Sequence, residues 1–325
     1  MSELHKFIFE GLPVRGALVR LTGAWQEVLQ RRAANTQTGP YPEPVRTVLG
    51  EMSAAAVLMQ SNIKFDGALV LQVAGDGPVK VAVVEVQPDF SFRSTATLAG
   101  EVPPLATLGE MVNQHGSGRC AITLDPRQRL PGQQPYQGVV PLTDDDGRAL
   151  PDFAAVLQQY MLRSEQLQTT LVLAADDHIA AGLLIQRLPV QGAGNLEGTQ
   201  QADAAAMEEH YNRIATLASS LKREELLTLD ADTVLRRLFW EETLNRFEPL
   251  VGDSGPRFAC SCSRERVGKM ILGLGQEDAE ALAAERGHIE VGCEFCGKQY
   301  RFDAVDTGEV FTEAARLGSG GTQAH

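Results

Sequence analysis

Four of the five cysteines in this 325-residue chain fall into two close pairs near the C-terminus. One residue separates Cys260 from Cys262, two separate Cys293 from Cys296, and thirty residues lie between the pairs. Two short chelating pairs of thiolates can close around a single tetrahedral Zn²⁺, and glycine directly after the second pair is typical of a zinc knuckle. The sequence therefore predicts one Zn²⁺ ion with these four ligands. Four buried structural thiols and an iron–sulfur site are the alternatives.

The spacing of Cys260 and Cys262 indicates redox chemistry as well as metal binding. A disulfide across one intervening residue closes a strained ring that is easily reduced again. A helix is expected to begin at Ser263, and the positive end of its dipole would favour the thiolate of Cys262. Because Zn²⁺ contributes roughly 10–16 kcal/mol to small metal-dependent domains, oxidation of its ligands should unfold the surrounding segment.

Composition and charge limit the possible partners and location. The chain is 43% hydrophobic with a net charge of −13, and its longest apolar run, Ile179–Ile185, is too short to cross a bilayer. The N-terminal residues lack the apolar core of a secretory signal, so we expect a cytoplasmic protein whose thiols stay reduced. From Arg246 to Val310, eight Lys and Arg face twelve Asp and Glu, the wrong balance for a phosphate-binding module. We expect neither a membrane nor a nucleic-acid partner.

Strand and helix patterns predict an α+β fold with a large mixed N-terminal domain at residues 1–189. Helices are expected where apolar residues recur every three or four positions, and strands where short β-rich runs are bounded by Gly and Pro. The expected helices are Trp25–Ala34, Val45–Gln60 and Pro151–Leu162, the last capped by Asp152. The expected strands are Ala68–Val73, Val79–Val86, Cys120–Leu124, Thr170–Ala174 and Gly182–Arg187.

A helical linker is expected at residues 190–250. It starts with the glycine-rich loop Val190–Gly198, followed by an amphipathic helix at Ala202–Leu221 and another helix that opens at Asp232 or Thr233. Helices of this length are marginal in water, so they must pack on another surface. The face with Met207, Tyr211 and Ile214 is either an ordinary packing face or a client-binding surface.

The small C-terminal zinc domain is expected at residues 251–310. Helices from Ser263 and at Gln276–Arg286 precede a strand, knuckle and strand arrangement at residues 288–302. Residues 311–325, which end LGSGGTQAH, are expected to form a flexible tail.

Several other features receive a structural interpretation. The segment Gly292–Gln299 approaches a phosphate-binding loop, but Gln299 replaces the Mg²⁺-binding hydroxyl and a strand follows where a helix is required, so we expect no ATP. Cys120 is interpreted as a small core residue, His288 as a surface residue, and Ser164–Gln166 as local hydrogen bonding after a helix. No residue is assigned a catalytic role, and we expect no enzymatic activity.

Beyond the cysteine pairs, long segments of the chain resemble the heat-shock protein 33 family, the redox-regulated 33 kDa chaperonins of bacteria. These segments are SNIKFDGALVLQV at Ser61–Val73, PYQGVVPL at Pro135–Leu142, LRSEQLQTTLVLA at Leu162–Ala174 and AAGLLIQRLP at Ala180–Pro189. The resemblance implies a reduced, zinc-bound, inactive form. It further implies that peroxide under unfolding conditions, or hypochlorous acid, forms the disulfides Cys260–Cys262 and Cys293–Cys296.

On the same resemblance, zinc is then released, the linker loosens, and a homodimer binds unfolding client proteins through the N-terminal domain without ATP. Two other functions remain as alternatives. One is a zinc-ribbon protein that binds nucleic acid. The other is a thiol oxidoreductase that uses Cys293 and Cys296, although the strands expected on both sides of this motif differ from the usual strand-to-helix setting.

Overall fold

The computed structural model describes residues 1–325 except 36–37, 129–131, 190–198 and 320–325, and for residues 199–205 and 315–319 it describes the backbone alone. The fold is α+β, as predicted. The chain divides into two compact units, Met1–Ala259 and Cys260–His325. Among the described residues, every helix is too short or too polar to span a lipid bilayer. The expected loop Val190–Gly198 lies outside the described residues.

The first sheet of the larger unit has the strand order β10-β1-β2-β9-β8, and β11 also pairs with β1. Its strands are β1 (Glu3–Phe9), β2 (Val14–Leu21), β8 (Thr169–Ala175), β9 (Ala180–Arg187), β10 (Leu244–Arg246) and β11 (Leu250–Val251). Strand β9 is buried from Ala180 to Gln186, so both faces of the sheet are covered at its centre. This explains why the sequence AAGLLIQR has an apolar run without the alternation of a half-exposed strand.

The second sheet has the order β12-β5-β4-β3-β6-β7. Its strands are β3 (Gly67–Ala74), β4 (Val79–Val86), β5 (Ser91–Leu98), β6 (Arg119–Pro126), β7 (Tyr136–Pro141) and β12 (Arg257–Phe258). All neighbours are antiparallel except β12, which lies parallel to β5. The three strands predicted in this region are confirmed, each within two residues at its ends.

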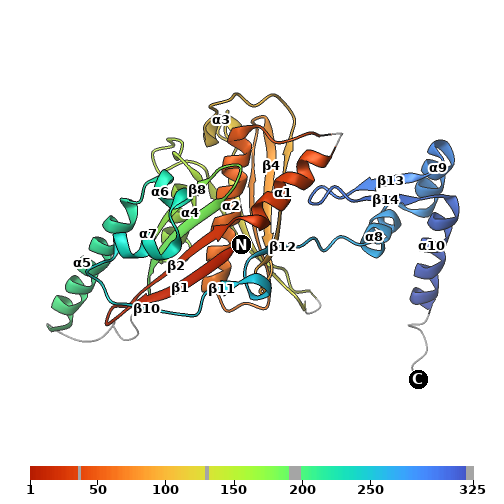
Figure 1. Ribbon diagram of the computed structural model, residues 1–325. Helices are drawn as coiled ribbons and strands as arrows, with labels where there is room; N and C mark the ends of the chain where they lie inside the picture. The colour runs from red at the N-terminus through yellow and green to blue at the C-terminus, as the bar shows by residue number, and fades with distance from the viewer. Residues whose placement is uncertain (36–37, 129–131, 190–198, 320–325) are drawn as a thin grey trace, which may run out of the picture. The chain divides into compact units, whose positions relative to one another are not determined.

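Helix α2 (Glu43–Asn62) is the central element of the larger unit, because it contacts strands of both sheets (Figure 1). Most of its residues are buried on all sides, as expected for a helix that lies inside a core. The other helices near this core are α1 (Gly23–Ala34), α3 (Leu108–Val112) and α4 (Phe153–Arg163). The predicted cap of α4 is confirmed, since Asp152 Oδ1 accepts a hydrogen bond of 2.8 Å from the amide of Ala155.

Three helices of the segment predicted as a linker pack on the other face of the first sheet, namely α5 (Thr199–Ser219), α6 (Arg223–Thr228) and α7 (Ala231–Leu238) (Figure 1). The predicted apolar face of α5 is buried there, with Tyr211 at 5% exposure and Ile214 at 0%. Helix α6 was not predicted. The predicted start of α7, at Asp232 or Thr233, was two or three residues too late, because Asp230 caps the helix by accepting a hydrogen bond from the amide of Thr233.

The smaller unit contains α8 (Arg264–Leu274), α9 (Gln276–Arg286), β13 (Ile289–Gly292), β14 (Gln299–Phe302) and α10 (Ala304–Ser319). Its core has few fully buried side chains, namely Val267, Ile271, Ala279, Ala283, Ile289, Tyr300 and Phe302. The two predicted helices and the strand, knuckle and strand arrangement are confirmed. A core of this size is small for an independent unit and suggests an additional source of stability.

Helix α10 continues through residues 311–319, where the sequence predicted a flexible tail. Its start is capped reciprocally, because the amide of Asp306 donates to Asp303 Oδ1 and the amide of Asp303 donates to Asp306 Oδ2. Val310 and Phe311 pack against the small core. These apolar residues explain why the helix stays docked over its first turns.

Candidate metal centre

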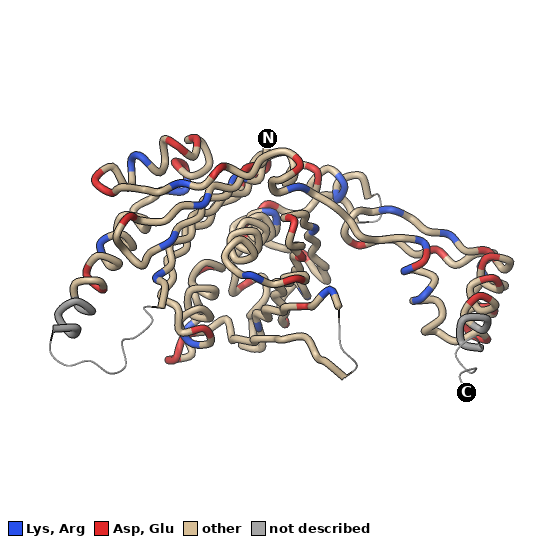
Figure 2. Tube along the Cα trace, turned by 90° about the horizontal axis from the view of Figure 1, so that it is seen from below, with Lys and Arg blue, Asp and Glu red and all other residues tan. Residues whose placement is uncertain are grey.

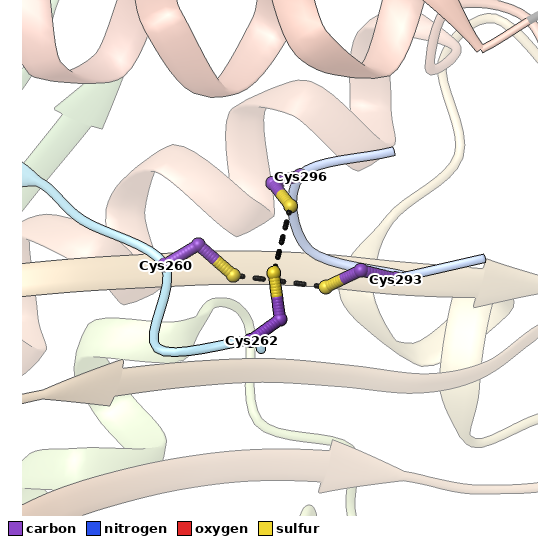
Figure 3. A group of neighbouring side chains, drawn as sticks. All are labelled: Cys260, Cys262, Cys293 and Cys296. Carbon is purple, nitrogen blue, oxygen red and sulfur yellow. Dashed lines mark hydrogen bonds between the residues drawn. The ribbon is translucent and has the colours of Figure 1, made fainter. Parts of the chain in front are cut away.

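The four predicted cysteines lie together in the smaller unit, on two separate segments. Cys260 and Cys262 are in the extended segment before α8, whereas Cys293 and Cys296 are in the turn between β13 and β14 (Figure 3). Their side chains point toward a common centre, and the four Sγ atoms all lie within 4.8 Å of one another. Chain folding thus joins two pairs that are thirty residues apart in sequence.

The turn that holds Cys293 and Cys296 has the hydrogen bonds of a knuckle. The Cys293 amide donates to the carbonyl of Lys298 at 2.9 Å, and the Gly297 amide donates to the carbonyl of Cys293 at 2.8 Å. Gly297 has a φ of +71°, a conformation that residues with a Cβ rarely adopt. Backbone amides of Phe295 and Cys296 also face the Cys293 sulfur. The glycine after the second pair therefore has the role that its position suggested.

The sulfur spacing fits a tetrahedral thiolate site. Cys260 Sγ is 3.6 Å from Cys293 Sγ, and Cys262 Sγ is 3.4 Å from Cys296 Sγ. Four metal–sulfur bonds of about 2.3 Å in a tetrahedron would separate neighbouring sulfurs by about 3.8 Å. A disulfide would require about 2.05 Å, and all four residues carry free thiols. An all-sulfur donor set with this spacing can hold one soft or borderline metal ion.

The start of α8 fixes the orientation of the first pair. Ser263 Oγ accepts a hydrogen bond of 3.2 Å from the amide of Arg266, which confirms Ser263 as the N-cap. Arg266 in turn donates to Ser261 Oγ at 2.6 Å, so the residue between the two cysteines is held as well. Arg264 donates to the carbonyl of Arg301 and pairs with Asp306 at 2.7 Å. These contacts connect α8 to β14 and α10.

The thiols differ in acidity because their surroundings differ. Partial burial alone would raise the pKa of Cys262, but hydrogen bonds, first of all from the Tyr300 hydroxyl at 3.1 Å, lower this pKa to about 7. Burial raises the pKa of Cys293 and, more strongly, that of Cys296. The hydrogen bond to Cys262 also raises the pKa of Tyr300. Cys262 therefore ionises more readily than Cys293 and Cys296.

Tyr300 is the residue of this site that the sequence analysis missed. It lies on β14, with 4% of its surface exposed, and its ring belongs to the small core. Alternation along Gln299–Phe302 places Tyr300 and Phe302 on the buried face, which was the available signal. Alternation predicts burial only, so the hydroxyl contact with a sulfur could not be inferred from it.

The other candidate residues are not members of the four-cysteine cluster. Cys120 is fully buried in β6, and burial raises its pKa to about 12, so its interpretation as a core residue is confirmed. His288 is partly exposed, with Nε2 3.9 Å from Glu290. Glu165 accepts hydrogen bonds from the hydroxyls of Tyr160 at 2.6 Å and Tyr136 at 3.2 Å. Glu165 thus connects α4 to β7. The sequence analysis predicted only local hydrogen bonds after the helix.

Comparison with known proteins places these observations in a family. The family model described as "Hsp33 protein" matches residues 2–303. The chain belongs to the Hsp33 protein family. A 33 kDa chaperonin of Chromobacterium violaceum is 44% identical over 313 residues, which cover 95% of this chain and 94% of that protein. A 33 kDa chaperonin of Methylobacillus flagellatus is 41% identical over 312 residues, with coverage of 96% and 94%.

The fold comparison agrees with the Hsp33 assignment. The crystal structure of the 33 kDa chaperonin (heat shock protein 33 homologue) of Thermotoga maritima superposes with a TM-score of 0.72. The alignment covers 97% of this chain and 99% of that one at 20% identity, so it supports the fold. The Hsp33 match and the names of the relatives support a chaperone function, which includes the binding of client proteins.

Proposed function

We propose that this Hsp33 protein is a redox-regulated holdase that binds unfolding proteins without ATP once its four clustered cysteines are oxidised. The observation that carries the proposal is the convergence of four free thiols in a unit with a very small core. One set of side chains is then both the main source of that unit's stability and the group that an oxidant attacks.

In the reduced state, Cys260, Cys262, Cys293 and Cys296 would hold one Zn²⁺ ion. The donor set and the sulfur separations of 3.4 and 3.6 Å fit this ion. Bound Zn²⁺ would supply structural cross-linking worth roughly 10–16 kcal/mol. The smaller unit would therefore be folded while its thiolates are ligands. The linker at residues 190–250 would stay on the core domain at residues 1–189, and the chaperone would be inactive.

Oxidation would convert the ligands into two disulfides, Cys260–Cys262 and Cys293–Cys296. For each disulfide, two thiols lose two electrons and two protons to one peroxide molecule, which becomes two waters. The closest sulfur contacts cross between the pairs, so the reduced geometry does not select this pairing. The family resemblance supports it, and so does loop closure: once the unit opens, partners within a pair stay close, whereas the crossed partners are 33 and 34 residues apart.

Loss of the ligands would unfold the zinc domain at residues 251–310 and loosen the linker. Helices α5 to α7 now cover an apolar face of the first sheet that includes Phe7, Phe9, Leu18, Leu183 and Ile185. Undocking would expose this face and the apolar faces of the helices themselves. We propose that the exposed surface binds unfolding clients, that the active form is a homodimer, and that the protein works in the cytoplasm.

Charge argues against the nucleic-acid alternative. Acidic residues are interspersed with basic ones along the described chain (Figure 2). Between Arg246 and Val310 the acidic residues are in excess, twelve to eight. A phosphate-binding surface requires the opposite balance.

Local structure argues against the thiol oxidoreductase alternative. The strands β13 and β14 on both sides of Cys293 and Cys296 differ from the usual strand-to-helix setting of a catalytic thiol pair.

A comparison of the reduced and oxidised protein tests this proposal. Zinc content, free thiols and disulfide pairing are measured before and after peroxide treatment with mild heating, with Cys120→Ser as the control variant. We expect one zinc per reduced chain, its release on oxidation, and suppression of the aggregation of a denatured test protein by the oxidised form only. Equal suppression by both forms, or zinc retention after all four thiols are oxidised, would contradict the proposal.

A further inference from the structure

Helix α6 is held on the core domain by reciprocal contacts of two arginines. Arg20 of β2 donates to the carbonyls of Leu226 at 2.7 Å and Leu227 at 3.4 Å, in the last turn of α6. In the opposite direction, Arg223 at the start of α6 donates to the carbonyl of Ala175, the last residue of β8. These contacts lie beside the apolar interface, where Leu226 is fully buried.

Arg223 also faces Glu51 of the buried helix α2. Its Nη1 atom lies 3.6 Å from Glu51 Oε1, within ion-pair distance but too long for a direct hydrogen bond. The Glu51 side chain is only 13% exposed, whereas that of Arg223 is 44% exposed. A carboxyl group is therefore enclosed at the linker interface beside a guanidinium that remains partly in water. The attraction of this partly hydrated guanidinium therefore offsets only part of the free energy that it costs to bury an ionised carboxylate.

Burial is the largest influence on Glu51 and raises its pKa to about 8, while Arg223 lowers the pKa and Asp152 raises it. Among the described residues, these are the charged groups that act on the carboxyl, one from α6 and one from the start of α4. A substantial share of docked molecules then holds a neutral Glu51 near pH 7. When α6 leaves, the carboxyl regains contact with water and its pKa returns toward about 4.3.

We propose that Glu51 and Arg223 form a latch between the core domain and the linker, and that release of the linker is coupled to loss of a proton from Glu51. The docked state retains the proton and the undocked state gives it up, so rising pH favours undocking. The effect is confined to the range between the ordinary pKa of a glutamate and about 8, and one proton changes the equilibrium by at most about tenfold per pH unit. The inference rests on the proposed function only for its biological role, which is to adjust how readily oxidation frees the linker.

The latch is tested by hydrogen exchange on the full-length, reduced, zinc-loaded protein between pH 6 and 8.5, with rates corrected for intrinsic exchange. In the unaltered protein, we expect the equilibrium constant for opening, measured at the α6 amides, to increase several-fold per pH unit up to about pH 8. Protection of β4 in the second sheet should stay constant and reports that the core remains folded. A flat pH profile for α6 would overturn the proposal without any variant.

Two variants should move the opening equilibrium in opposite directions. Glu51→Gln keeps the size of the side chain and removes its ionisable group. At pH 8, α6 should therefore open less than in the unaltered protein, and its opening should not depend on pH. Arg223→Met removes both the cation beside Glu51 and the hydrogen bond to the Ala175 carbonyl, so α6 should open more at every pH. Glu27→Gln is the matched control, because Glu27 forms an exposed ion pair with Arg31 within α1. A Glu51→Gln profile that follows that of the unaltered protein would overturn the latch.

The latch and the proposed function can fail separately. If oxidised protein suppresses aggregation but α6 opening does not depend on Glu51, the latch is wrong and the chaperone switch stands. If α6 opening follows Glu51 as described but oxidised protein does not suppress aggregation, the latch stands and the proposed function is wrong.

Discussion

The core between the two sheets and the core of the smaller unit differ in size and in the groups that they contain. In the first, α2 and the strands on both sides of it bury a large apolar cluster that includes Trp25, Leu49 and Phe92. In the second, a short hairpin and three helices surround a few side chains and four sulfurs. Apolar burial cannot be withdrawn by a small molecule, whereas ligation by thiolates can. If the four cysteines bind zinc as proposed, the protein combines an apolar core with a second core whose stability depends on its ligands.

Removal of a metal ligand should produce the largest difference between the two units. Cys296→Ser deletes the most buried of the four thiols, and binding energy of roughly 10–16 kcal/mol depends on the complete ligand set. We expect loss of zinc and of amide protection from Cys260 onward, with the strands of both large sheets still protected. Zinc analysis and hydrogen exchange would check this. Cys120→Ser should retain zinc, and a Cys296→Ser protein that does the same would remove the contrast.

Two matched phenylalanines offer a direct comparison of the cores. Phe92 and Phe302 are each 1% exposed, one in each core, and Phe→Ala at such sites costs about 3–5 kcal/mol. Phe302→Ala should weaken zinc binding by at least a hundredfold, because folding and metal binding are coupled in the smaller unit. Phe92→Ala should lower the unfolding midpoint of the larger unit and leave zinc affinity unchanged. Chelator competition and denaturant titration distinguish these outcomes, and identical responses of the two variants would refute the distinction.

The linker interface should respond less than either core. Ile214 is fully buried between α5 and the first sheet, and Ile214→Ala should cost about 2–5 kcal/mol. Because this penalty falls on the docked state, the reduced protein should gain partial ability to suppress aggregation. Glu209→Ala, on the exposed side of the same helix, is the control. An Ile214→Ala protein that is fully inactive when reduced and whose α5 amides are as protected as before would exclude this role.

The smallest effect is expected at the hydrogen bond to Cys262. Tyr300→Phe keeps the ring in the core and removes the hydroxyl that donates to Sγ. Loss of such a supporting contact typically lowers metal affinity by about 10- to 100-fold. We expect weaker zinc binding in chelator competition with unchanged protection of β13 and β14. Unchanged affinity would show that the ligand set is sufficient without this donor.

The sequence predicted those elements whose patterns are local. Helix α2 was predicted within two residues at each end, since its long apolar stretch has no competing strand or turn signal. Strands β3 and β4 were predicted because Gly and Pro bound their β-rich runs. The strands β1 and β2 were missed, as charged residues interrupt both of them. Helix α6 was missed because six residues contain less than two helical turns, and its stability comes from Arg20 and the sheet beneath it.

The candidate site was more predictable than the fold around it. Spacing alone selected Cys260, Cys262, Cys293 and Cys296, since a chelating pair is a feature of local sequence. The contacts that tune the site are not local. Tyr300 reaches Cys262 across 38 residues, and Arg264 reaches Arg301 across 37. Such contacts arise only when the strands and helices have packed, so they could not be inferred from spacing.

Strand β12 is the last strand of the larger unit before the smaller unit begins. It consists of Arg257 and Phe258 beside β5, with Arg257 paired to Asp89 and the Ala259 amide bonded to the carbonyl of Phe92 at 3.0 Å. The next residue is Cys260. In sequence, these contacts stand between the four cysteines and the preceding segment 190–250. If oxidation unfolds the smaller unit as proposed, the contacts of β12 within the larger unit must also break before the linker is released, so we expect mild heating to assist that release.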